Sequence, residues 1–133
     1  MTRKMLLIVL AGCLLVLCAA CSGKKAQVQR NEGEVKEVVE SAGHGDASAE
    51  YNMGVMYHTG NGVQQDYAKA LRWYRMAAAK GEAEAEFKLG VMYLHGQGVE
   101  QSRYTAQDWF NKSCLHGSRM GCEQYRLMSR DLW

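Results

Sequence analysis

Two cysteines near the C-terminal end are spaced so that they could carry chemistry. Cys114 and Cys122 lie eight residues apart in the stretch "CLHGSRMGC", and His116 lies between them. The spacing is too long for the CxxC pair of thiol oxidoreductases. A zinc site would need further ligands, because one histidine with two cysteines leaves the usual ligand set incomplete. These residues alone therefore predict neither a redox pair nor a metal site.

The common catalytic motifs do not occur in the sequence. There is no GxSxG, no HExxH and no phosphate-binding loop. The stretch "SGKK" at residues 22–25 matches the SxxK pattern of penicillin-recognising serine enzymes, but it lies in a polar stretch outside the folded part, where nothing could preorganise a nucleophile. The other histidines, His44, His58 and His95, are expected at the surface, in loops and at helix ends. We predict no catalytic residues, no cofactor and no bound metal.

Length and charge narrow the possible partners. The 133 residues suffice for one small domain. The formal net charge is +2, and two of the basic residues, Arg3 and Lys4, belong to the basic start of the chain, so the remainder is close to neutral. Nucleic-acid binding needs a basic surface that contacts phosphates, and this composition does not supply one. We expect no nucleic-acid partner.

The N-terminal segment has the pattern of an export signal. The basic start "MTRK" is followed by the apolar stretch "MLLIVLAGCLLVLCAA" over residues 5–20. This stretch is short for a transmembrane helix, which needs about 20 apolar residues. Small residues followed by a cysteine resemble the lipobox of bacterial lipoproteins, in which the cysteine becomes the diacylated first residue of the mature chain. An ordinary signal peptide or an uncleaved anchor is the alternative.

The lipobox resemblance implies one of two lipidated cysteines. Cys13 in "LAGC" matches the family pattern better, whereas Cys21 in "CAAC" uses the full apolar run and precedes a polar tether. We predict Cys21, with Cys13 as the alternative. Residues 1–20 are then the signal peptide, 21–31 the lipidated cysteine and its tether, and 32–133 a folded domain. Ser22 stands where aspartate would retain an enteric lipoprotein in the inner membrane, which implies the periplasmic side of the outer membrane.

The folded part is dominated by an internal repeat with a period of 36 residues. Residues 47–82 align with residues 83–118, and "GVMYHTGNGVQQ" returns as "GVMYLHGQGVEQ". Such a period is typical of stacked helical hairpins. In each unit, apolar residues recur at helical spacing before and after a glycine-rich break. In the first unit, Gly60 or Gly62 can end the first helix, and Asp66 can cap the second. Gly54 and Gly90 lie inside helices, which predicts close helix crossings.

These residues resemble the Sel-like repeats, which are relatives of the tetratricopeptide repeats. The resemblance lies in "AEYNMGVMYHTGNGVQQDYAKALRWYRMAAAKG" and "AEFKLGVMYLHGQGVEQ" and weakens after Gln101. It implies an all-α fold, a short right-handed α/α solenoid of helical hairpins with terminal capping helices. We expect a cap helix at 32–44, two helices in each of the repeats 47–82 and 83–118, and a C-terminal helix at 119–131. Tyr57, Tyr93, Trp73 and Trp109 are expected in the core.

The resemblance also implies the disulfide and the binding surface. Cysteine-rich Sel-like proteins bridge each hairpin at this spacing, so Cys114 and Cys122 are expected to pair, as an oxidising compartment permits. In the tetratricopeptide relatives the first helix of each pair lines a concave face, and Tyr51 and Phe87 would form an apolar strip on it. Carried over by position, this face consists of Ser48, Tyr51, Val55, His58, Thr59, Glu84, Phe87, Val91, Leu94 and His95.

The expected partner of this face is a protein, because the surface is partly aromatic and apolar. No small-molecule substrate is expected, and the N-terminal lipid would attach the protein to the membrane. Relatives of this kind serve as adaptors in envelope assembly, in signalling and in host contact, or as immunity lipoproteins. The alternative function, implied by the cysteine-rich relatives, is penicillin binding with weak β-lactam hydrolysis. The sequence supplies no nucleophile beside a base for that chemistry.

Overall fold

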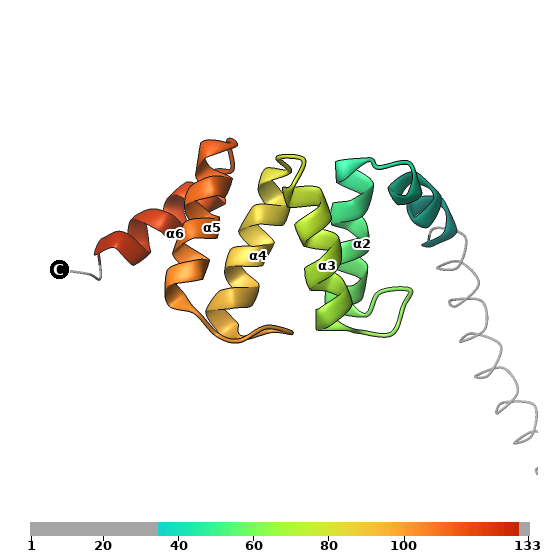
Figure 1. Cartoon of the computed structure of the whole chain (residues 1–133), viewed down its shortest axis with the longest axis horizontal. Helices are drawn as coiled ribbons and strands as arrows, with labels where there is room; N and C mark the ends of the chain where they lie inside the picture. The colour runs from blue at the N-terminus through green and yellow to red at the C-terminus, as the bar shows by residue number, and fades with distance from the viewer. Residues whose placement is uncertain (1–34, 131–133) are drawn as a thin grey trace, which may run out of the picture. The chain divides into compact units, whose positions relative to one another are not determined.

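The protein is described here by a computed structural model, which covers residues 35–130 (Figure 1). A helical segment at residues 35–43 is followed by the helices α2 (Ala47–Thr59), α3 (Tyr67–Ala78), α4 (Ala83–His95), α5 (Arg103–Leu115) and α6 (Arg119–Arg130). No strand occurs within these residues, so the predicted all-α fold is confirmed. The predicted signal peptide and tether, with Cys13 and Cys21, lie outside the described residues.

The helix ends follow from local sequence. Asp66 caps α3, because its side chain accepts a hydrogen bond from the backbone N–H of Lys69 at 3.0 Å. Gly60 and Gly96 end α2 and α4 with φ values of 74° and 68°, a left-handed conformation that glycine adopts at little cost. The predicted cap and the predicted stop of the first repeat are therefore both present. Because the two repeats end their first helices in the same way, their hairpins have matching geometry.

The largest core cluster lies between the repeats rather than inside one hairpin. It combines Tyr74 and its neighbours on α3 with Leu89 and Met92 on α4, and all three of these side chains are buried. A second cluster around Met53 packs toward the N-terminal helical segment, and a third around Phe110 includes Met128 of α6. Each hairpin therefore buries apolar surface against the next, as stacked repeats must.

Two glycines allow the helices of each hairpin to approach closely. A β-carbon added to Gly54 would lie 2.4 Å from the ring of Tyr74, and one added to Gly90 would lie 2.6 Å from the ring of Phe110. Both rings are buried, so neither can move aside freely. The predicted close crossings are confirmed, and each is the contact of a first-helix glycine with a second-helix aromatic ring.

We expect Gly54→Ala to destabilise the domain by about 1–3 kcal/mol, because overpacking against a buried ring outweighs the better helix propensity of alanine. The free energy of unfolding in urea measures the effect. Gly43→Ala is the matched control: Gly43 is helical and has no atom within 4 Å of an added β-carbon, so this change should be neutral or slightly stabilising. Equal effects of the two substitutions would contradict the proposed role of the crossing.

Candidate functional site

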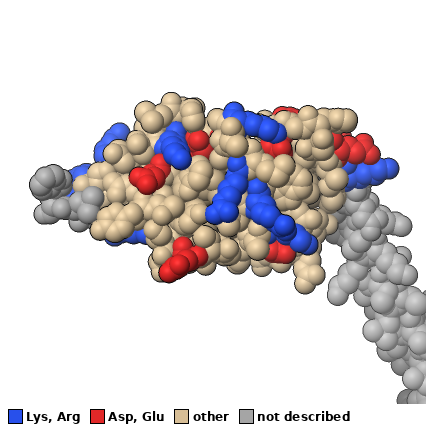
Figure 2. Space-filling model, in the orientation of Figure 1, with Lys and Arg blue, Asp and Glu red and all other residues tan. Residues whose placement is uncertain are grey.

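The candidate site is the set of α2 and α4 residues predicted to line a binding surface, which we call the first-helix face. Ser48, Thr59 and His95 are exposed on it. The other members are half-buried: Tyr51, Val55, His58, Glu84, Phe87, Val91 and Leu94. The α3 residues Lys69, Arg72 and Arg75, by contrast, are exposed, and Figure 2 shows basic side chains gathered over the middle of the face that it presents.

Tyr51 and Phe87, the two equivalent aromatic residues of the first-helix face, were expected to form an exposed apolar strip but are half-buried. The Tyr51 ring centroid lies 5.8 Å from that of Tyr74, and the Phe87 centroid lies 5.5 Å from that of Phe110. Each ring thus packs on the buried aromatic ring of its own hairpin. Both rings are half-buried at the edge of a core cluster, so part of each supports the fold and the remainder faces outward.

Tyr51 has an acidic neighbourhood. Burial raises the pKa of its phenol, and the negative charges of Glu84 on α4 and of Glu82 just before α4 raise it further. The hydroxyl therefore stays protonated at physiological pH and can donate a hydrogen bond. Burial likewise raises the pKa of Tyr74. This part of the face can offer an aromatic surface and a neutral donor to a partner, but not a phenolate base.

His58 links the two repeats at the other end of the face. Its Nε2 lies 3.1 Å from Oε1 of Gln97, in the loop after α4, and its ring lies 5.2 Å from the ring of Tyr67. The half-buried imidazole thus differs from the predicted surface position, whereas His44 and His95 are exposed as predicted. Because its contacts come from both repeats, His58 fixes their relative position beside the face.

Two buried glutamates were not predicted to have a role. The carboxylate of Glu50 accepts from Nζ of Lys80 at 2.6 Å, and that of Glu86 lies 2.8 Å from Nδ1 of His116. Lys80 and His116 occupy equivalent positions in the turns that follow the second helices. The sequence did carry a signal for such a role, because Glu50 and Glu86 are identical across the repeat although they lie on otherwise apolar helix faces. A buried acid in both units indicates that a polar partner from elsewhere in the fold must reach it.

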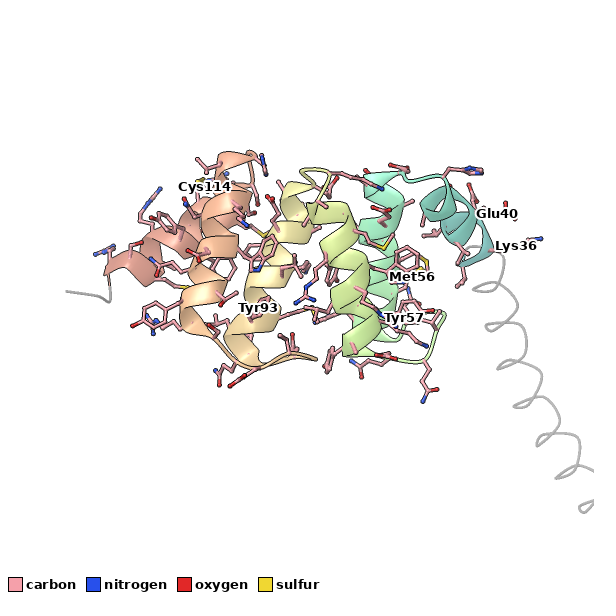
Figure 3. All side chains as sticks on the ribbon, in the orientation of Figure 1. Lys36, Glu40, Met56, Tyr57, Tyr93 and Cys114 are labelled. Carbon is pink, nitrogen blue, oxygen red and sulfur yellow. A yellow bond between two sulfur atoms is a disulfide. The ribbon has the colours of Figure 1, made fainter. Side chains whose placement is uncertain are left out.

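The disulfide between Cys114 and Cys122 joins the end of α5 to the start of α6, with a Cα–Cα distance of 4.4 Å, as predicted (Figure 3). Two further contacts hold the same turn, because Ser118 donates to Glu84 at 2.9 Å and Ser113 donates to the Ala83 carbonyl at 2.7 Å. The hairpin of α5 and α6 is therefore closed by the disulfide and is also hydrogen-bonded to the start of α4.

The four aromatic residues predicted for the core are half-buried and pack against the core clusters: Tyr57, Tyr93, Trp73 and Trp109. Among residues 35–130, no three His, Cys, Asp or Glu side chains are grouped so that they could hold a metal ion. None of the helices described is long and apolar enough to cross a membrane.

Helical hairpins repeated every 36 residues, stacked through a shared core, define an α/α repeat protein. The Sel1 repeat model matches residues 47–82 and 83–118, which are the two units of the internal repeat. The chain belongs to the Sel1 repeat family. Proteins of this family are generally protein–protein interaction modules, and most are non-enzymatic scaffolds. Comparison with curated protein sequences finds no match.

Several solved structures resemble this one. A protective antigen present in uropathogenic Escherichia coli strains, displaying an SLR fold, is 35% identical with a TM-score of 0.68 over 71% of this chain and 20% of its own. A Sel1 repeat protein from Oxalobacter formigenes is 29% identical with a TM-score of 0.68 over 72% of this chain and 40% of its own. This chain thus spans less than half of either relative.

The Helicobacter pylori cysteine rich protein B shares the fold. It is 24% identical, with a TM-score of 0.64 over 67% of each chain.

We expect Lys80→Met to destabilise the domain by about 2–3 kcal/mol, because it leaves the carboxylate of Glu50, which is 1% exposed, without its cation. Glu50→Met combined with Lys80→Met should cost clearly less, since no buried charge then remains. Lys69→Met, which removes an exposed lysine whose Asp66 contact is 3.8 Å, is the control and should cost little. Unfolding in urea measures all three. A double variant less stable than Lys80→Met alone would disprove the argument.

Proposed function

We propose that this protein is a membrane-anchored module of the bacterial cell envelope that faces the periplasm and binds a protein partner along the first-helix face. The observation that carries the proposal is the stacking of two Sel1 repeats. The core between α3 and α4 holds the hairpins together and brings α2 into contact with α4. Residues of two first helices then contribute to one surface, which is larger than either hairpin could offer.

The chemistry of the face favours a protein over a small polar metabolite. Half-buried aromatic and apolar side chains such as Tyr51, Phe87 and Leu94 lie among the exposed Ser48, Thr59 and His95. Protein interfaces commonly combine partly exposed aromatic anchors with a polar rim. The hydrogen bond between His58 and Gln97 fastens the two repeats beside the face, so little conformational freedom need be lost on binding.

The membrane anchor rests on the N-terminal sequence. A basic start, an apolar run and a cysteine before a polar tether favour lipidation at Cys21, with Cys13 as the alternative. Ser22 favours the outer membrane as the destination. An adaptor in envelope assembly and an immunity-type lipoprotein both fit a single repeat domain on such an anchor. No observation on the described residues favours β-lactam hydrolysis.

We expect Cys21→Ala to release the protein from the membrane fraction and to abolish palmitate labelling, because it removes the thiol that carries the lipid. Fractionation of cells that express the full chain, with metabolic labelling, measures both effects. Cys13→Ala is the control and should keep the label and the membrane association. If Cys13→Ala abolishes them and Cys21→Ala does not, the lipid is attached at the other site.

A photo-crosslinking amino acid at Thr59 or His95 should give a discrete crosslinked band in envelope preparations, because both positions are exposed on the first-helix face. The same amino acid at Arg72, exposed on α3, is the control and should give none. Mass spectrometry of the band distinguishes a partner from a second copy of the chain. A band from Arg72 alone would place the partner on the other side of the molecule.

A further inference from the structure

The loops that connect the helices of each hairpin place one tyrosine of each repeat in the same setting. The backbone N–H of Asp66 donates to the Tyr57 carbonyl at 2.8 Å, and that of Ser102 donates to the Tyr93 carbonyl at 2.9 Å. Asp66 and Ser102 each cap the following helix. Tyr57 near the end of α2 and Tyr93 near the end of α4 (Figure 3) therefore have the same relation to their loops.

The two tyrosines differ in what lies beside the ring. In the first repeat, Nζ of Lys69 lies 5.3 Å from the centroid of the Tyr57 ring, within the range of a cation–π contact. The equivalent residue of the second repeat is Thr105, whose side chain is too short to reach across a ring. Here the structure has an open cavity of about 490 Å³ beside Tyr93, which we call the Tyr93 groove; it is lined by Tyr93, Val99, Glu100, Gln101, Ser102 and Thr105.

A carboxylate and a guanidinium lie beside the Tyr93 groove, those of Glu100 and Arg75. Glu100 is exposed at its edge, where the first repeat has the neutral Gln64. Arg75 of the preceding repeat donates from Nη2 to the Tyr93 hydroxyl at 2.6 Å. This hydrogen bond fixes the position of the Tyr93 hydroxyl and, with it, that of the ring. The positive charge of Arg75 disfavours a second cation nearby, and the carboxylate of Glu100 offsets it.

We propose that the Tyr93 groove binds a lysine side chain of a partner protein. The ammonium group lies over the Tyr93 ring as that of Lys69 lies over Tyr57, beside the carboxylate of Glu100, and the methylene groups pack against Val99. In the first repeat the Lys69 ammonium also lies 3.8 Å from the carboxylate of Asp66. The equivalent residue of the second repeat is the neutral Ser102, so the carboxylate there would come from Glu100. The groove shares no residue with the first-helix face, so the inference stands independently of the partner proposed for that face.

The test is a titration of the full chain in detergent, ¹³C-labelled at tyrosine, with the peptide acetyl-Gly-Lys-Gly-amide at millimolar concentration. We expect a saturable shift of the Tyr93 ring signals. The corresponding Gln peptide should bind about threefold more weakly, as loss of an exposed cation–π contact implies. Thr105→Lys should abolish the response, because the new lysine side chain would itself occupy the groove. The equivalent residue of the first repeat is Lys69, whose backbone N–H donates to the cap residue Asp66, so a lysine is compatible with this position of the helix. Lys69→Thr should add a saturable shift at Tyr57.

Glu100→Gln provides a second variant at an exposed position, which should weaken the Lys peptide about twofold to fivefold without altering the fold. Helical circular dichroism of each variant checks folding. The proposal is overturned if no saturable shift occurs, if the Gln peptide binds as well as the Lys peptide, or if folded Thr105→Lys responds like the parent protein. Preferential binding of acetyl-Gly-Glu-Gly-amide would also overturn it, because the groove would then be an anion site served by Arg75.

Discussion

The contact between Gly54 and the ring of Tyr74 is the constraint on which the rest of the structure depends. Because Gly54 has no β-carbon, α3 approaches α2 closely enough to bury the ring completely. The same ring belongs to the cluster that joins α3 to Leu89 on α4. One side chain thus closes a hairpin and stacks it on the next. In the second repeat Phe110, packed on Gly90, is likewise part of the cluster that contains Met128 of α6.

Polar contacts then fix the positions of the helices along one another, which apolar packing alone does not set. Lys80 reaches both the buried Glu50 and the Gly45 carbonyl, so the turn after α3 is tied to the start of α2. At the opposite ends of the helices, His58 and Gln97 connect the repeats. Helices held at both ends cannot slide along each other without breaking buried or half-buried polar contacts. The surfaces made by neighbouring repeats are accordingly preorganised, which reduces the cost of binding.

The sequence predicted the helices of the repeats, the cap at Asp66 and the close crossings, because each depends on local residue types or on the repeat. The disulfide was expected from the resemblance to the cysteine-rich Sel-like proteins. It did not predict how deeply particular rings are buried. Tyr51 and Phe87 were expected to be exposed, but alignment of the repeats gives equivalence of positions and not contact between units. The partner of Glu86 was missed for a related reason: Lys80 is replaced by His116, so the residue that contacts the buried glutamate is not identical in the two repeats.

The two repeats keep the residues that set their geometry and differ in the residues that set their chemistry. The glycines of the crossings are identical, and both rings packed on them are aromatic. Two of the differences lie where side chains reach the surface or its edge: Lys69 against Thr105, and Gln64 against Glu100. A substitution at such positions changes charge and open volume without disturbing the stacking. Two units of one architecture can therefore present different recognition sites, and what each recognises follows from its exposed residues rather than from the fold they share.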